Sequence, residues 1–242
     1  MPASELALVF IVFFTSSLTA VVGLGGGVLL ITLMPGLVPA AAIIPLHACT
    51  QLASNVSRAA FGWRNIDWTI IPAFTLGAIV GTWVGGEIYQ GLNLHWLPAV
   101  IGLIILVVTW LPLPVLRSSG QLALVLVGFL QTGLGMLAGA TGPLGAAVLV
   151  RRNQQRDWLV VNTAVYMTLN HCIRMLAFVA IGFSFAPWWP LLAGMVCAGI
   201  LGSWLGTRLR RFVPEGNFHG WFRWLVSLLA LRMIALPFFT PG

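Results

Sequence analysis

The sequence contains no lysine and few charged residues of either sign: among 242 residues there are twelve arginines and five acidic residues, and the formal net charge is +7. Charged residues make up 7% of the chain and hydrophobic residues 59%, with a mean hydropathy of +0.98. So much apolar surface exceeds what the core of a soluble domain can bury. The composition therefore excludes a soluble protein and predicts a polytopic protein embedded in a lipid bilayer.

The arginines are spread over short loops and helix ends instead of being clustered on one face. This distribution is not typical of a nucleic-acid-binding surface, so we expect no nucleic acid partner. Arginines in short loops instead orient a membrane protein, because cytoplasmic loops carry an excess of positive charge. The N-terminal residues Met1–Glu5 lack the positive region of a secretory signal, so we expect the first apolar segment to be retained.

Cysteine is scarce, and Cys49, Cys172 and Cys197 each lie inside an apolar segment without CxxC spacing. This pattern predicts neither a disulfide framework nor a zinc site. The chain has no HExxH motif and no GxSxG motif, and His47 with Ser54 lacks a third catalytic group. We therefore expect no enzyme activity, no metal and no cofactor.

Apolar segments joined by short loops account for most of the chain, which predicts an all-α polytopic membrane protein. Tryptophan opens five of the segments, as in the aromatic belt at a membrane interface. The segments are residues 6–34, 40–61, 68–86, 96–111, 122–150, 158–182, 188–207 and 221–239.

The segment 6–34 is too long for one crossing and too short for two, since a spanning helix takes about 20 apolar residues. It is interrupted by Gly23-Leu24-Gly25-Gly26-Gly27, and four glycines in five positions weaken a helix. The sequence therefore predicts a broken helix or a re-entrant hairpin. Such backbone is tolerated at membrane depth only where it is buried in protein or lines a cavity, so the break predicts a site.

The chain contains an internal repeat with a shift of 116 residues, which predicts two repeated halves at residues 1–118 and 119–242. The shift relates Leu6 to Leu122, Gly23 to Gly139, Gly26 to Gly142 and Arg58 to Arg174. The second overlong segment, 122–150, is broken at the matching place by Gly139-Ala140-Thr141-Gly142-Pro143.

The positions of the arginines in the loops then favour one of two membrane topologies. If each broken segment crosses once, Arg64 and Arg117 lie opposite Arg151 and the arginines near residue 210; if each enters and returns, all lie on one side. The positive-inside rule favours the second arrangement. Each half then has three spanning helices besides its broken one, the halves are inverted, and both termini lie outside the cytoplasm.

Polar residues at helical spacing form one stripe in each half. The first holds His47, Gln51, Ser54 and Arg58, with Asn55 beside them, and the second holds Asn162 or Thr163, Tyr166, Asn170, His171 and Arg174. A mid-bilayer arginine costs roughly 2.5–3.5 kcal/mol and needs a partner, but no acidic residue falls inside these segments. The sequence therefore predicts an anion as the partner of Arg58 and Arg174. The alternative is that both arginines lie near helix ends, where they reach lipid phosphates or cap carbonyls.

The glycine breaks add a second feature that favours an oxyanion, because a helix that begins at membrane depth presents free N–H groups and the positive end of its dipole. These groups lie around Gly25, Gly26 and Gly27 in the first half, and around Thr141 and Gly142 in the second. The alternative is that the glycines only allow close packing of helices.

The glycine run Gly23–Gly27 with Pro35 and Pro39, the polar second helix that ends near Arg58, and the Gly-x-x-Gly-Pro echo at residues 139–143 resemble the TauE/SafE family of membrane transporters, also called the sulfite exporter family. The resemblance covers residues 6–235. It implies an internally duplicated membrane protein that moves sulfite, organosulfonates or other small anions. Family members often carry a Thr-Ser pair where this chain has Cys49-Thr50-Gln51.

The sequence thus predicts a secondary transporter of a small anion, sulfite or an organosulfonate, bound between the two repeats by helix N-termini and paired arginines. The expected binding residues are Gly25, Gly26, Gly27, His47, Gln51, Asn55, Arg58, Thr141, Gly142, Asn170, His171 and Arg174. Any coupling proton travels on a histidine or on the substrate. The alternative function is a thiol or electron carrier that uses Cys49 and Cys172, and assembly as a homodimer stays open.

Overall fold

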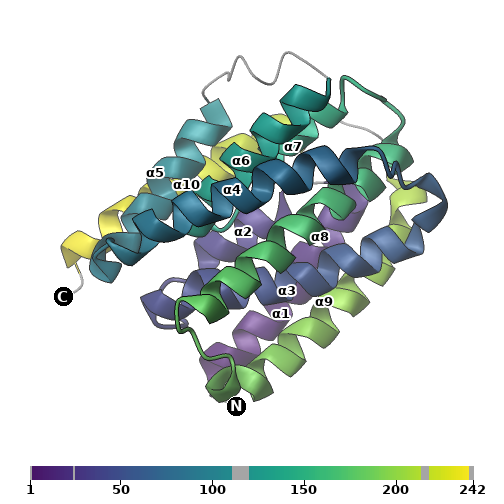
Figure 1. The fold of residues 1–242 in the computed structure, drawn as a ribbon. Coiled ribbons are helices and arrows are strands. Elements are labelled where there is room, and N and C mark those ends of the chain that lie inside the picture. Colours follow the sequence, from purple (N-terminus) through teal and green to yellow (C-terminus); the bar gives the residue numbers. More distant parts are fainter. Residues whose placement is uncertain (1, 24, 111–119, 214–217, 240–242) are drawn as a thin grey trace.

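The computed structural model describes residues 2–23, 25–110, 120–213 and 218–239, and this part of the chain is almost entirely helical (Figure 1). The first series of helices is α1 (Ala3–Val22), α2 (Gly26–Leu33), α3 (Ala40–Phe61), α4 (Ile70–Gln90) and α5 (Leu97–Trp110). The second is α6 (Gln121–Ala138), α7 (Gly142–Leu149), α8 (Arg156–Ala180), α9 (Trp189–Leu209) and α10 (Phe218–Phe239). Short 3₁₀ turns lie between them, among them η1 (Trp63–Asn65) and η5 (Arg210–Phe212). The all-α prediction is confirmed.

The surface and the interior have the polarity of a membrane protein. Five stretches are long and apolar enough to cross a bilayer: Ala3–Val22, Trp68–Gln90, Gln121–Ala138, Ala186–Phe212 and Gly220–Phe239. Helices α3 and α8 are also of spanning length, at 22 and 25 residues, but carry the polar stripes. Large apolar side chains such as those of Phe14, Trp83 and Trp221 are exposed, whereas the side chains of the stripes are buried. Apolar residues thus face lipid and polar residues face the interior.

Helices of one half pack mainly on helices of the other (Figure 1). The main pairs are α1 with α9, α4 with α6, α3 with α8, and α5 with α10. The larger hydrophobic core also mixes residues of both series, for example Leu8 and Ile44 with Phe178 and Met195. The halves therefore share one core. Their division at residue 118, which lies outside the described residues, and their inverted orientation stay predictions.

Two of these pairs are packed backbone to backbone at several glycines each, and the pair α5–α10 at one, Gly102. Gly77, Gly81 and Gly85 of α4 lie against the α6 backbone, where an added Cβ would meet the carbonyls of residues 125, 129 and 133. Gly202 and Gly206 of α9 lie in the same way against the α1 backbone. Small residues at membrane helix interfaces allow this close approach. The pairs α4–α6 and α1–α9 are therefore the tightest joints of the fold.

The two overlong segments are each a long helix followed by a helix of eight residues. Helix α1 ends at Gly23 (φ 100°), and α2 begins after Gly25 (φ 104°), backbone angles that side chains other than glycine rarely adopt. Gly26 lies against the carbonyl of Thr15, so the chain turns back beside α1. The break is where the glycines predict it, and re-entrance with respect to a bilayer stays a prediction.

The second break has the same form. Helix α6 ends at Gly139 (φ 70°), whose N–H donates to the carbonyl of Gly135 at 2.8 Å. The Thr141 hydroxyl then donates to the Gln131 carbonyl at 2.7 Å, and the Gly145 N–H donates to the Gln131 side chain at 2.8 Å. Gln131 therefore holds α7 against α6.

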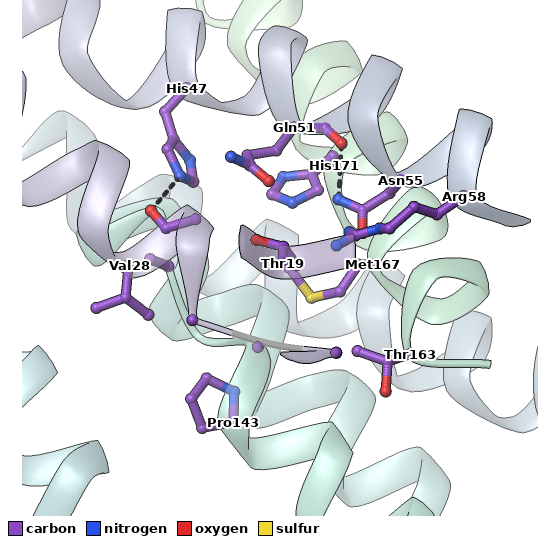
Figure 2. A pocket seen from close by; sticks show the side chains of 15 residues that line it. Thr19, Val28, His47, Gln51, Asn55, Arg58, Pro143, Thr163, Met167 and His171 are labelled. Atoms are coloured by element: carbon purple, nitrogen blue, oxygen red, sulfur yellow. Dashed lines mark hydrogen bonds between the residues drawn. The ribbon is translucent and has the colours of Figure 1, made fainter. Parts of the chain in front are cut away.

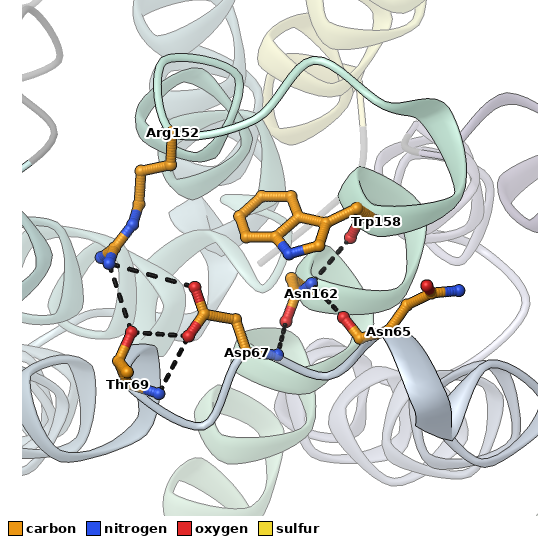
Figure 3. Close-up of polar contacts among 6 residues, drawn as sticks. All are labelled: Asn65, Asp67, Thr69, Arg152, Trp158 and Asn162. Carbon is orange, nitrogen blue, oxygen red and sulfur yellow. Dashed lines mark hydrogen bonds and ion pairs between the residues drawn. The ribbon is translucent and has the colours of Figure 1, made fainter.

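The arginine-bearing loops meet at one end of the molecule. Figure 3 shows Arg152 beside Asp67 and Thr69, with an N–O distance of 4.0 Å to the Asp67 carboxylate, and Asn162 bridges to the Asp67 N–H and the Asn65 carbonyl. At the same end Arg210 pairs with Asp157 at 3.0 Å. Three loops, those near residues 64, 152 and 210, are thus joined to one another. Arg117 lies outside the described residues.

Candidate functional site

Buried polar side chains gather where α3 faces α8, next to both helix breaks (Figure 2). The rings of His47 on α3 and His171 on α8 lie 5.8 Å apart, centroid to centroid. Both are fully buried. The structure thus brings the two stripes together, although the residues lie more than a hundred positions apart in the sequence.

A cavity of about 40 Å³ lies at this meeting point, large enough for a few water molecules. Helix α3 and the two breaks form most of its wall, and α8 closes the remaining side (Figure 2). Eight of the predicted binding residues line it: Gly25, Gly27, His47, Gln51, Asn55, Arg58, Gly142 and His171. The other lining residues are Thr19, Gly23, Val28, Ala140, Pro143, Thr163 and Met167.

The remaining four predicted residues lie behind this wall. Gly26 packs against the Thr15 carbonyl, and Thr141 donates to the Gln131 carbonyl. The side-chain amide of Asn170 donates to the Thr132 hydroxyl at 3.2 Å. Arg174, the fourth, is fully buried and has partners of its own.

Arg174 caps the C-terminal end of α6. Its Nη1 donates to the carbonyls of Gly135 at 2.8 Å and Gly139 at 2.6 Å, and its Nη2 lies 2.8 Å from Nδ1 of His171. The last carbonyls of a helix have no partner within the helix, and a cation at this end also interacts favourably with the helix dipole. Arg174 therefore matches the carbonyl-capping alternative.

Arg58 differs from Arg174, its counterpart in the repeat, in its hydrogen-bond partners. It is 4% exposed and its Nη2 donates to Oδ1 of Asn55, but within the described part of the chain Nε and Nη1 have no hydrogen-bond partner. The end of α1 is capped instead by the first residue of α8, because Arg156 Nη2 donates to the Val21 carbonyl at 2.6 Å. Arg58 is thus free to offer two N–H groups to a ligand.

The hydrogen-bond partners of the two histidines fix which ring nitrogen donates. Nε2 of His47 lies 2.9 Å from the Gly27 carbonyl, which can only accept, so Nε2 carries the hydrogen and Nδ1 holds a lone pair (Figure 2). Nδ1 of His171 accepts from Arg174, so its Nε2 carries the hydrogen. Among the described residues neither His47 Nδ1 nor His171 Nε2 has a partner.

The described part of the structure has two larger cavities, and one of them adjoins the site. One of about 190 Å³ shares Val28 and Pro143 with the first and is otherwise lined by α5 and α10. The other, of about 580 Å³, lies at the arginine-bearing end and is lined by Arg156, Arg210 and Arg211 among others. A small enclosed site thus lies near an apolar cavity and a basic one.

Sequence reasoning did not assign Thr19, Met167, Val28 and Pro143 to the site. The repeat could have indicated Met167, since it stands 116 residues after Gln51. Nothing in the sequence marks Thr19, because its hydroxyl donates to the Thr15 carbonyl inside α1 and only the fold places it at the cavity.

The described residues of this site support neither a metal-binding site nor a thiol carrier. Within the residues that the structure describes, no group of three or more His, Cys, Asp or Glu side chains could hold a metal ion. Neither Cys49 nor Cys172 lines the cavity, and Cys172 is exposed on the outside of α8. The thiol-carrier alternative is therefore unsupported.

A helical protein with spanning helices, two broken helices and a buried polar cavity between them has the construction of a membrane transporter. The chain belongs to the sulfite exporter TauE/SafE family, whose model matches residues 8–233. It is also 27% identical over 164 residues to the probable inner membrane transporter protein TsaS of Comamonas testosteroni, a match that covers 63% of this chain and 64% of that protein. No solved structure matches the chain.

Proposed function

We propose that this protein is a secondary transporter that carries a small anion, sulfite or an organosulfonate, across a bacterial inner membrane. The anion binds in the 40 Å³ cavity between α3, α8 and the two breaks. The observation that carries the proposal is Arg58, a buried cation that lines the cavity with two N–H groups without a partner in the described chain. A buried charge is stable only when paired, and an anion supplies the missing pair.

Other donors converge on the same space. Nε2 of Gln51 and Nε2 of His171 line the cavity and have no partner among the described residues. Helix α2 begins at Gly26 beside the cavity, and the first N–H groups of a helix have no acceptor within it. Helix α7 offers less, because its second residue, Pro143, has no N–H. The anion therefore lies on the α2 side of the site, next to Arg58.

The size of the cavity selects among anions. A volume of about 40 Å³ suits an anion of a few heavy atoms, such as sulfite. A sulfonate with a carbon chain needs further space, and the 190 Å³ cavity behind Val28 and Pro143 is the nearest apolar one. A sulfonate head would bind at Arg58 with its carbon chain directed toward α5 and α10.

The joined loops support the topology on which this transport scheme depends. Asp67 pairs with Arg152, so the loops that carry Arg64 and Arg151 lie at the same end. A single crossing of each broken segment would place these loops on opposite faces of the bilayer. The contact therefore favours segments that enter and return, with inverted halves and the basic cavity at the cytoplasmic end.

Binding to purified protein tests the proposal. Sulfite, methanesulfonate, sulfoacetate, sulfate and acetate are titrated into the wild type and the Arg58→Gln variant, with Arg232→Gln, an exposed arginine of α10, as the matched control. We expect sulfite or a sulfonate to bind the wild type and the control, and not to bind Arg58→Gln. If Arg58→Gln binds the anion with the same affinity as the wild type, the anion does not bind in this cavity.

A further inference from the structure

Among the described lining residues of the cavity, the buried side-chain atoms without a hydrogen-bond partner include more donors than acceptors. Four buried donor atoms on residues that line it have no partner in the described chain: Nε and Nη1 of Arg58, Nε2 of Gln51 and Nε2 of His171. Among the buried side-chain atoms of the same described lining residues, Nδ1 of His47 is the one acceptor without a partner. A ligand that fits these groups accepts several hydrogen bonds and donates one.

The acceptor role of His47 is set by its backbone contact. The Gly27 carbonyl at 2.9 Å accepts from Nε2, so the neutral ring presents a lone pair at Nδ1. Gly27 belongs to the first turn of α2, which the glycine break positions. The break therefore fixes the direction in which His47 can accept.

The groups packed around His47 include no acid. From α8 it faces His171 and, beyond it, the Arg174 guanidinium, which binds the Gly139 carbonyl next to Nδ1. The packed parts of α2 and of the second break contribute backbone, and the next polar side chain on α3 is Gln51. The described surroundings of Nδ1 thus offer it no donor, and the donor has to come with the ligand.

We propose that the transporter binds its anion in a singly protonated form, an oxyanion that keeps one O–H, with that O–H donating to Nδ1 of His47, while Gln51 and His171 donate to its other oxygens and Arg58 balances its charge. Hydrogen sulfite has this chemistry. The fully ionised sulfite dianion offers acceptors only, and one of its oxygens would face the His47 lone pair, an unsatisfied buried contact. This inference rests on the proposed function and adds the protonation state of the substrate.

The proposal has a consequence for coupling. A proton that travels on the anion needs no titrating residue in the protein, and each anion moves with one proton and one negative charge. Electrostatic attraction alone makes the opposite prediction, because Arg58 and the α2 N-terminus attract a dianion more strongly than a monoanion. The pH dependence of binding therefore distinguishes binding of the protonated monoanion from binding of the dianion.

The experiment compares sulfite with methanesulfonate, which has no ionisable proton near neutrality, in binding to purified wild-type protein across neutral and mildly alkaline pH. We expect the apparent affinity for sulfite to fall about tenfold for each pH unit above its second ionisation, in proportion to the protonated fraction, and that for methanesulfonate to stay constant. A parallel fall for both would assign the titration to the protein, and a constant or rising sulfite affinity would show that the dianion binds. Either result overturns the inference while leaving an anion site in place.

A variant tests the role of His47 directly. In His47→Leu the acceptor is lost, so we expect the preference for hydrogen sulfite over sulfite to disappear, and the affinity for sulfite no longer to fall as the pH rises. If His47→Leu does not fold, the wild-type comparison still decides. Absence of binding for both anions in folded wild type would overturn the proposed function, and the inference with it.

Discussion

Substitutions of the two repeat-related arginines, Arg58 and Arg174, should have different effects, one on the stability of the fold and the other on anion binding. Arg174 donates to two buried carbonyls at the end of α6 and to a ring nitrogen of His171, whereas within the described chain Arg58 has one side-chain partner, Asn55. Replacing Arg174 by glutamine removes both carbonyl contacts, and the Gly135 carbonyl then keeps only its bond from the Gly139 N–H. Replacing Arg58 removes a buried cation whose remaining donors face the cavity. The first change should therefore damage the fold, and the second should damage binding.

The size of each effect follows from the hydrogen bonds that the substitution removes. Hydrogen bonds to charged groups contribute roughly 1.5–3 kcal/mol each in soluble proteins, whereas side-chain hydrogen bonds within membranes average about 0.6 kcal/mol. With two charge-assisted hydrogen bonds lost in Arg174→Gln we expect a loss of about 3 kcal/mol, which for a chain of this size lowers Tm by roughly 6–12 °C. Removing a buried charge that has no ionic partner should be nearly neutral, so Arg58→Gln should shift Tm by less than about 3 °C.

The assay is thermal unfolding in detergent, followed by tryptophan fluorescence, beside anion binding at a temperature where both variants are folded. Arg174→Gln should keep measurable binding, and Arg58→Gln should lose it. Equal destabilisation by both substitutions would show that Arg58 is also structural. An unchanged Tm in Arg174→Gln would refute the assignment of Arg174 as the cap of α6.

Three further outcomes are expected. Single cysteines are placed at Arg64 and Arg151 in a background without native cysteines and treated with an impermeant thiol reagent, on intact cells and on inverted vesicles. In each preparation the two positions should show the same labelling, and opposite labelling of the two positions would exclude the re-entrant topology. Gly81→Leu should prevent stable folding because its side chain meets the α6 backbone, whereas Gly220→Leu, with open space around it, should fold normally; the yield of monodisperse protein in detergent measures both. Cys49→Ser should retain at least about half of wild-type anion uptake into vesicles, and its abolition would return the thiol carrier to consideration.

Periodicity and glycine content predicted the helices and both breaks because these are local properties. The stripe on α3 follows from helical spacing alone, and the structure places His47, Gln51 and Arg58 of that stripe around one cavity with the neighbouring Asn55, whereas Ser54 forms a hydrogen bond with Ser203 of α9. The partners of Arg174 could not be predicted in the same way, since the carbonyls it caps lie at the end of α6 and meet it only when α8 packs beside that helix. The repeat predicts that two arginines correspond in position, but it does not predict that Arg156 caps the end of α1 while Arg174 caps the end of α6.

The glycine contacts also limit how such a protein can open. Rocking one half of the sequence against the other would pull α1 from α9 and α4 from α6, along two joints that are packed backbone to backbone. Motions that keep both joints intact move α1 with α9 and α4 with α6. Because α3 also packs on α9, and α8 on α4, each rigid body combines helices of both halves. The seam between these two bodies is the α3–α8 contact, so the proposed transport function predicts that access to the anion alternates where His47 meets His171.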